Sequence, residues 1–289
     1  MKSVRELQKK YLPAVAPEDF FILLSHGSGK EKVFLLAHPE HELSANETEK
    51  VETYLKRRLK SEPVAYIVEK REFYGRDFHV TSDTLIPRPE TEHMIESILE
   101  RVNGRQEEET DIIDIGTGSG NIIITLAKEI QKIHPVSCIK YHALDISGAA
   151  LRVAEQNATY HHVNSTLSFL ESDLLQNFSL TQKKKSHAII AANLPYLSKM
   201  IYEASEKDVR DYEPKSALIS GTDGLDHYRR LLHELANFSL HHISTTLFLE
   251  ISPEQTGPLR ELILISFPHS TICIIRDLSG RERLMKASF

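Results

Sequence analysis

The segment Asp111-Ile112-Ile113-Asp114-Ile115-Gly116-Thr117-Gly118-Ser119-Gly120, followed directly by NIIITLAKEI (121–130), is the clearest indication of fold in this 289-residue chain. Its first half is a short apolar run typical of a buried strand, and the segment after it has the apolar periodicity of a helix. Alternating glycines allow the backbone between them to turn tightly and approach a ligand closely. The start of the helix leaves backbone N–H groups free. The pattern predicts a strand–loop–helix unit at a ligand-binding edge.

The spacing of the glycines narrows the class of ligand. It is G-x-G-x-G, which differs from the G-x-G-x-x-G of dinucleotide sites, and no Gly-Lys-Ser/Thr follows as in a phosphate-binding loop. Without a pyrophosphate signature, a nucleoside that lacks phosphates fits better, and S-adenosylmethionine (SAM) is the common one. A tight strand–helix turn that binds no ligand is the alternative at this point.

Beyond this loop the chain alternates apolar runs with helical segments. The runs are KYHALDIS (140–147), LSFLESD (167–173), HAIIAANLPY (187–196), TTLFLEIS (245–252) and STICIIRDL (270–278). Short continuous apolar strands separated by helices are typical of a mostly parallel sheet that is covered on both faces. A turn at Gly280 leads into one further possible strand. We therefore expect an α/β fold.

Two of these runs end in an acidic residue. Asp145 lies about 25 residues past the glycines, where a carboxylate can accept from both ribose hydroxyls. Asp173 ends the next run, where its carboxylate can accept from an adenine amino group. The carboxyl ends of neighbouring strands line one crevice, so the two acids and the loop together favour a nucleoside site, although each acid alone would more often cap a helix. An acidic rim also suits the sulfonium cation of SAM.

The run that ends at Asn193-Leu194-Pro195-Tyr196 has an unusually polar corner. Methyl transfer from a sulfonium is an in-line displacement, for which a protein mainly supplies positioning. An asparagine followed by proline and tyrosine suits a planar NH2 acceptor, because the amide oxygen takes one N–H, a backbone carbonyl takes the other and the ring packs beside the plane. Asn193, Pro195 and Tyr196 are thus the catalytic candidates. An Asx-type turn with a core tyrosine is the alternative if the glycines and acids are disregarded.

The first 70 residues read as helices without a convincing strand. Ser44-Ala45-Asn46-Glu47 has the spacing of a capping box, and the apolar segments 19–27 and 32–40 predict short helices broken by Gly27, Gly29 and Pro39. The alternation of Phe73, Phe78 and Val80 around Gly75 predicts a hairpin, and Pro89 can begin a helix. We expect a helical domain over 1–70, a hairpin linker over 71–88 and the α/β domain over 89–289.

The chain resembles the HemK/PrmC family, SAM-dependent methyltransferases that modify the glutamine of the Gly-Gly-Gln motif in peptide chain release factors. The resemblance covers most of the chain and is carried by EPVAYIVEKREFYG (62–75), TLIPRPETE (84–92), DIGTGSGNI (114–122), Leu144-Asp145, AANLPY (191–196), EPKSALISGTDGLDHYRRLL (213–232), LFLEIS (247–252) and DLSGRER (277–283). TLIPRPETE and GTDGLDHYR are more diagnostic than the glycine loop, which many methyltransferases share. The resemblance implies a helical N-terminal domain, a hairpin linker and a Rossmann-like class I SAM-dependent methyltransferase domain. Its mostly parallel seven-stranded sheet would have an antiparallel seventh strand.

The resemblance also implies roles for individual residues. The methionine part of SAM would be wrapped by Gly116, Thr117, Gly118, Ser119 and Gly120. Asp145 would bind the ribose, and Asp173 with Leu174 would border the adenine. The substrate glutamine amide would be held by Asn193, Leu194, Pro195 and Tyr196, with Asn193 also bordering the cofactor. Arg88, Glu90 and Thr91 would lie beside the same pocket, where they can also cap a helix.

Leu194 departs from the usual Asn-Pro-Pro-Tyr of the family, in which the second residue contributes only its backbone carbonyl. Leucine keeps that carbonyl, and Pro195 disfavours helical geometry for the residue before it. The fixed φ of a proline is lost, and an additional N–H needs a partner. We expect activity to survive this substitution.

Composition restricts the remaining classes of function. The chain is 40% hydrophobic and 26% charged with a net charge of −6, which gives no global electrostatic case for nucleic-acid binding. Cys138 and Cys273 lie in apolar, strand-like surroundings and predict buried free thiols in a reducing cytosol. The N-terminus is too polar for a signal peptide and no apolar run is long enough for a membrane span, so a cytoplasmic protein is expected. The 15 histidines lack ligand spacing, and no metal is predicted.

Two rival functions stay open. A nucleic-acid adenine methyltransferase would share the corner at Asn193, but it would need a flipped base and a phosphate-binding face; the negative charge and the lack of tryptophan weigh against it. A SAM- or nucleotide-binding regulator without catalysis would not need that corner. The main expectation is a release factor as partner, recognised outside its glutamine loop by the helical domain, with no membrane and no direct nucleic-acid binding.

Overall fold

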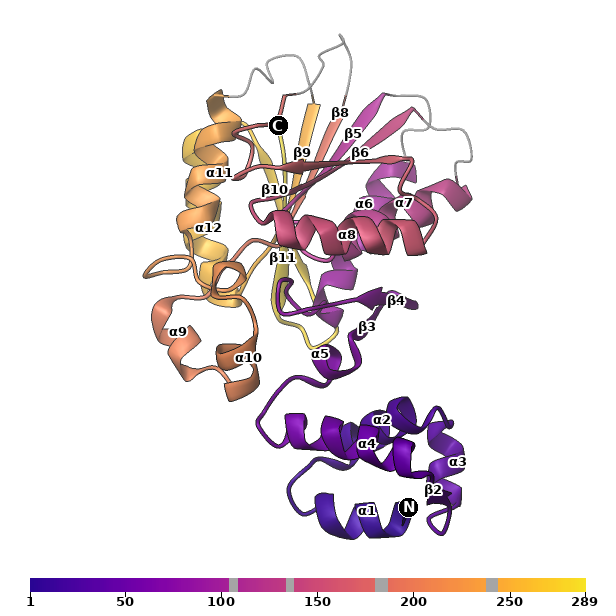
Figure 1. Cartoon of the computed structure of the whole chain (residues 1–289). Helices are drawn as coiled ribbons and strands as arrows, with labels where there is room; N and C mark the ends of the chain where they lie inside the picture. The colour runs from indigo at the N-terminus through magenta and orange to yellow at the C-terminus, as the bar shows by residue number, and fades with distance from the viewer. Residues whose placement is uncertain (104–108, 134–137, 180–186, 238–243) are drawn as a thin grey trace. The chain divides into compact units, whose positions relative to one another are not determined.

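The computed structural model describes residues 1–103, 109–133, 138–179, 187–237 and 244–289. The chain divides into two compact units (Figure 1). The first comprises Met1–Lys70 together with Ser205–Tyr212, and the second comprises Arg71–Ala204 and Glu213–Phe289. The candidate site residues identified above all lie in the second unit.

The first unit is built from short helices. They are α1 (Val4–Tyr11), α2 (Pro17–Ser28), α3 (Lys32–Ala37), α4 (Ala45–Arg58), α5 (Val64–Val68) and α10 (Lys207–Tyr212). The capping box predicted at the start of α4 is present, because the Glu47 N–H donates to Ser44 Oγ (3.3 Å) and the Ser44 N–H donates to Glu47 Oε2 (2.8 Å). These bonds satisfy backbone donors that the first helical turn leaves free.

Two expectations for this unit are wrong. Gly27 does not break a helix: α2 continues to Ser28, and Gly29 ends it in the left-handed conformation. A Cβ at Gly27 would lie 2.5 Å from Val51 Cγ2, so the glycine lets α2 approach α4 closely. The unit also contains one strand pair, β1 (Lys2–Ser3) with β2 (Glu42–Leu43), which is too short to leave an alternating pattern in the sequence.

A hairpin of β3 (Lys70–Phe73) and β4 (Arg76–His79) begins at the boundary of the two units, and all of it but Lys70 belongs to the second. The turn residues Tyr74 and Gly75 both have positive φ, 51° and 69°, as a tight hairpin turn requires. Phe73 and Phe78 are buried and meet edge to face. The hairpin thereby contributes apolar side chains to the core of the α/β unit.

A seven-stranded sheet forms the centre of this unit, in the order β10-β11-β9-β8-β5-β6-β7. The strands are β5 (Thr110–Ile115), β6 (Ile139–Asp145), β7 (Leu167–Glu171), β8 (His187–Ala192), β9 (Ser244–Glu250), β10 (Thr271–Arg276) and β11 (Glu282–Ser288). β5 to β9 run parallel to one another, and β11 is antiparallel to both β9 and β10. The mostly parallel sheet with an antiparallel last strand is confirmed.

Helices cover both faces of the sheet, with α6 and α7 on one side and α11 and α12 on the other (Figure 1). The helical segments of this unit are η1 (Pro89–Thr91), α6 (Glu92–Asn103), α7 (Asn121–Ile133), α8 (Gly148–Tyr160), α9 (Lys199–Ala204), η2 (Lys215–Ala217), α11 (Asp226–Asn237), η3 (Pro253–Gln255) and α12 (Thr256–Ser266). Ile112 packs on the α6 side, and Ile113 and Ile115 pack on the α11 side. Two covered faces explain why the strands are continuously apolar.

The strand order places a crevice at the end of β5. This strand lies between β6 and β8; the chain continues from β6 to β7 on one side and from β8 to β9 on the other. In an open α/β sheet, ligands bind outside the carboxyl ends of the strands at such a switch point. The glycine loop after β5 and the corner after β8 both leave the sheet at this edge.

The burial predicted for the cysteines is wrong, since Cys138 and Cys273 are both exposed. Cys273 lies on β10, an edge strand on which alternate side chains face away from the core, and Cys138 directly precedes β6. Among the helices of the described ranges, none is both long and apolar enough to cross a membrane.

Candidate active site

The glycine loop after β5 turns back on itself through left-handed backbone. Gly116, Gly118 and Gly120 have φ values of 73°, 54° and 78°, which side chains rarely tolerate. The N–H groups of Gly116 and Thr117 donate to the Leu144 carbonyl at 2.8 and 2.9 Å and so bind the loop to β6. A Cβ at Gly118 would meet no atom nearer than 4.0 Å, so the backbone there faces open space.

Asp114, near the end of β5, stabilises the glycine loop through its side chain. Its side chain is fully buried, and Thr117 Oγ1 donates to its Oδ2 at 2.7 Å. Burial raises the pKa of Asp114 to about 7, and the Thr117 hydrogen bond opposes that change. The contact fixes the side chain of Thr117 within the turn.

Asp145, at the end of β6, lies directly against the loop. Its Oδ2 accepts from the Gly118 N–H (2.9 Å) and its Oδ1 from the Ser147 N–H (2.8 Å). Burial raises the pKa of this carboxyl, while the backbone N–H donors lower it. A carboxylate has about four acceptor sites, and three backbone N–H groups act on this one, those of Gly118, Ser147 and Ile146, so it can still accept from a ligand hydroxyl.

A cavity of about 320 Å³ opens at this edge of the sheet, at the lower end of the range of small-molecule sites. The predicted site residues that line it are Gly116, Thr117, Gly118, Ser119, Asp145, Asp173, Leu174, Asn193, Leu194 and Pro195. Arg88 and Thr91 also line it. Gly120, Tyr196 and Glu90 are not among the lining residues. A Cβ at Gly120 would lie 2.7 Å from Ile124 Cδ1, so this glycine serves packing against α7.

Asp173 has a partner that the sequence analysis did not identify. Arg230 Nη2, on α11, donates to Asp173 Oδ2 at 2.7 Å, and both side chains are partly exposed at the cavity. Leu174, beside it, is buried with a φ of 53°. The ion pair shares the Asp173 carboxylate between Arg230 and any adenine amino group that binds at this end.

One of the two polar groups of the Asn193 side chain has a hydrogen-bond partner. Its Nδ2 donates to Thr91 Oγ1 at 3.2 Å, whereas its Oδ1 is buried and has no hydrogen-bond partner within the described part of the chain. A buried acceptor without a donor costs about 1–3 kcal/mol. An incoming N–H group at this position would remove that cost, which makes the corner a prepared acceptor for a donor at the cavity wall.

The GTDGLDHYR segment lies against the backbone of the corner at Tyr196. Gln255 Nε2 donates to the carbonyls of Tyr196 (3.0 Å) and Gly224 (2.9 Å). A Cβ at Gly224 would overlap the Tyr196 carbonyl oxygen, so no larger residue fits. The glycine of the GTDGLDHYR motif is thus explained by the close approach of its backbone to the backbone of Tyr196.

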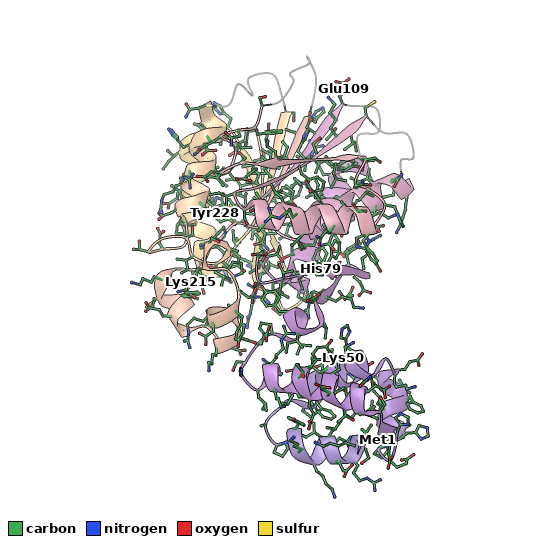
Figure 2. The ribbon with its side chains drawn as sticks, viewed as in Figure 1. Met1, Lys50, His79, Glu109, Lys215 and Tyr228 are labelled. Atoms are coloured by element: carbon green, nitrogen blue, oxygen red, sulfur yellow. The ribbon has the colours of Figure 1, made fainter. Side chains whose placement is uncertain are left out.

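Leu194 fills the space beside the glycine loop. Its side chain is buried, and its Cδ2 would lie 3.2 Å from a Cβ placed on Gly116. Its backbone N–H lies near Tyr228 and lowers the pKa of that hydroxyl, against the rise that burial causes. Tyr228 is a fully buried residue of α11, labelled in Figure 2, and it donates to the Glu250 carbonyl. The additional N–H of leucine thus lies beside a buried hydroxyl.

We predict that Leu194→Pro retains methyl transfer to within about tenfold, because the carbonyl remains and Tyr228 keeps the Glu250 carbonyl as acceptor. The variant should unfold at a lower temperature, since the buried leucine side chain is lost at a cost of about 1.5–3 kcal/mol. Leu194→Ala, which keeps the N–H, is the matched control. A folded Leu194→Pro protein that binds SAM but transfers no methyl would contradict the role given to the backbone.

Two buried glutamates that the sequence analysis did not single out organise the corner. Glu213 accepts from the Ile86 N–H at 3.2 Å and pairs with Arg88, and it thereby ties the linker to the EPKSAL segment. Glu250 ends β9 and accepts from Thr91 Oγ1 at 2.6 Å. Both lie in motifs that carry the family resemblance, and for Glu250 a carboxylate at the end of an apolar strand was a usable signal, as at Asp145.

Comparison with protein families matches both units. Residues 3–68 match the PrmC N-terminal domain, and residues 106–217 match a methyltransferase domain. The solved structures that are most similar include the hMettl16 catalytic domain in complex with the MAT2A 3'UTR hairpin 1, with a TM-score of 0.56 at 15% identity over 94% of this chain and 91% of that one. Another is the N-terminal domain of human METTL16 in complex with SAH, with a TM-score of 0.51 at 14% identity over 94% of each chain. At these identities the likeness extends to the fold alone.

Curated relatives are much closer in sequence. The release factor glutamine methyltransferase of Koribacter versatilis is 38% identical over 91% of this chain and 88% of its own length. Those of Bacillus anthracis and Bacillus subtilis are both 33% identical over 92% of this chain, and 90% and 89% of their own lengths. With two units matched and identity sustained over nearly the whole length, the chain belongs to the release factor glutamine methyltransferase family.

Proposed function

We propose that this protein transfers a methyl group from SAM to the side-chain amide nitrogen of the glutamine in the Gly-Gly-Gln motif of peptide chain release factors. The observation that carries the proposal is the buried, unpartnered Oδ1 of Asn193 at the wall of the cavity. An amide NH2 group has two N–H donors and lies in a plane. Asn193 Oδ1 accepts one of them and the Leu194 carbonyl accepts the other.

The residues at the strand ends fit SAM. The open space over Gly118 admits a ligand against the backbone, and the buried Asp145 carboxylate beside it suits the ribose hydroxyls. Asp173 and Leu174 border the adenine, with Arg230 beside them. When bound, SAM supplies an electrophilic methyl group on a sulfonium centre. The chain itself orients the acceptor nitrogen, holds its two N–H groups in hydrogen bonds to two oxygens and excludes water. Positioning of this kind supplies about 7–11 kcal/mol of a barrier.

The relatives named as release factor glutamine methyltransferases support the choice of substrate. We assign recognition of the release factor outside its glutamine loop to the helical unit, whose match to the PrmC N-terminal domain supports that role. A substrate of translation termination places the protein in the cytoplasm. Its net charge of −6 favours a protein substrate over the phosphate backbone of a nucleic acid.

The test is incubation with labelled SAM and one of three acceptors: a release factor, the same factor with its motif glutamine replaced, or duplex DNA. We expect label on the unmodified release factor alone. Label on DNA, or equal label on the factor without its glutamine, would overturn the proposal and favour the adenine or another methyltransferase activity.

A further inference from the structure

We propose that Thr91 and Glu250 form a positioning relay that fixes the orientation of the Asn193 amide, so that its oxygen faces the substrate. The relay is defined by three side chains, Asn193, Thr91 and Glu250. The inference rests on the proposed function, because the orientation of Asn193 affects turnover only if an N–H donor binds there.

The relay joins three separate parts of the chain. Asn193 follows β8, Thr91 ends η1 and Glu250 ends β9. Asn193 Nδ2 donates to Thr91 Oγ1 at 3.2 Å, and Thr91 Oγ1 donates to Glu250 Oε2 at 2.6 Å. Thr91 and Glu250 are 2% and 4% exposed, so water does not compete for these bonds.

The direction of the relay follows from the number of protons available. A hydroxyl has one proton, and an ionised carboxylate can only accept it. The Thr91 oxygen must then accept from Asn193, which requires that the NH2 group of the amide faces Thr91. The amide oxygen is left on the other side, buried and without a partner among the described residues.

The opposite orientation would oppose the reaction. With the amide turned over, the Asn193 NH2 group would face the NH2 group of the substrate, and two buried donors would lack acceptors. A substrate amide could then not be held with its nitrogen toward the donor methyl group. Thr91 and Glu250 therefore act on the reaction through the orientation of the Asn193 amide.

The ionisation of Glu250 makes the relay sensitive to pH. Burial raises the pKa of Glu250 to about 7, and the Thr91 hydrogen bond opposes this change. Other charged or titratable groups also face Glu250, namely Glu90, which raises its pKa, Arg283 and Arg88, which lower it, and Tyr196 and Tyr228. When protonated, Glu250 can donate to Thr91, whose hydroxyl is then free to donate to Asn193, and the amide can turn over.

The first test compares Thr91→Val, which keeps the shape but removes the hydroxyl, with Thr91→Ser, which keeps the hydroxyl. Single-turnover rates are measured with saturating labelled SAM and a release factor. We expect Thr91→Val to lower the rate by about tenfold or more with SAM affinity unchanged, and Thr91→Ser to stay within about threefold of the parent protein. Thr125→Val is the matched control, because the Thr125 hydroxyl is buried in α7 and has no partner in the described ranges.

The second test is the pH profile of the rate. The parent protein should lose activity as the pH falls through about 7, because the active form of Glu250 is the ionised one. Glu250→Gln should be slower and should have a smaller acid limb, because Asp114, whose pKa burial also raises to about 7, is still present. A limb of parental size and midpoint in Glu250→Gln would overturn the relay, as would a Thr91→Val protein of parental rate or a Thr91→Ser protein as slow as Thr91→Val.

A third measurement needs no substrate. The side-chain NH2 resonances of Asn193 in the free protein, assigned by their loss in Asn193→Ala, should shift in Thr91→Val and keep their positions in Thr125→Val. Unchanged resonances in Thr91→Val would overturn the relay. A parent protein that methylates no release factor would instead overturn the proposed function, while this measurement would still decide the inference.

Discussion

Asn193→Ala is expected to lower methyl transfer to a release factor by about 10²–10³-fold, the range found when one preorganised transition-state contact is removed. The variant loses Asn193 Oδ1, a buried oxygen without a hydrogen-bond partner in the described part of the chain. SAM affinity should fall far less, because the loop at Gly118 and the carboxylate of Asp145 are unchanged. Single-turnover rates and calorimetric titration with SAM separate the two effects.

Asn237→Ala is the matched control for this variant. Asn237 is the last residue of α11 and is exposed, and its side-chain Nδ2 contacts the carbonyl oxygen (2.9 Å) and Nε2 (3.2 Å) of His233. It should transfer methyl at the parental rate. Full turnover by Asn193→Ala would mean that the acceptor site has been misplaced.

Asp145→Asn is expected to weaken SAM binding by about 1.5–3 kcal/mol, or about tenfold to more than a hundredfold in Kd. The carboxylate oxygens accept from the N–H groups of Gly118 and Ser147. An amide offers one oxygen and one NH2 group, so one backbone N–H would face another donor. The glycine loop would then move away from the position in which it meets a ligand.

Glu171→Gln is the comparison for this change, since Glu171 is the register neighbour of Asp145 on β7 and is not among the residues that line the cavity. Calorimetry should give the parental SAM affinity for Glu171→Gln. An Asp145→Asn protein that is folded and binds SAM as tightly as the parent would contradict the role of this carboxylate.

Local sequence patterns predict the fold of the second unit well, because the apolar residues of each strand indicate which of its faces are buried. Ile112, Ile113 and Ile115 are apolar in succession since both faces of β5 are covered. The cysteines fail for the corresponding reason. Cys273 is surrounded by apolar residues in the sequence, yet β10 lies at the edge of the sheet. The sequence of a single strand does not encode the order of the strands in the sheet.

The residues of the candidate site likewise divide into those that the sequence predicts and those that it does not. Asn193 and Asp145 were predicted because each follows a strand that can be recognised by itself. The contacts Thr91–Glu250 and Asp173–Arg230 join residues 159 and 57 positions apart. Such pairings depend on the tertiary arrangement of η1, β9 and α11, which no local spacing encodes. Leu194 is intermediate, since the sequence showed that its N–H needs a partner but not that the Tyr228 hydroxyl lies near it.

The central claim is that the corner at Asn193 holds a planar amide against the cofactor cavity. A crystal structure of the protein with S-adenosylhomocysteine and a peptide containing the Gly-Gly-Gln motif tests it most directly. We predict that the glutamine amide nitrogen lies about 3 Å from Asn193 Oδ1 and at a similar distance from the Leu194 carbonyl oxygen. A glutamine amide bound elsewhere in the cavity, with another group or a water molecule on Asn193 Oδ1, would contradict the claim.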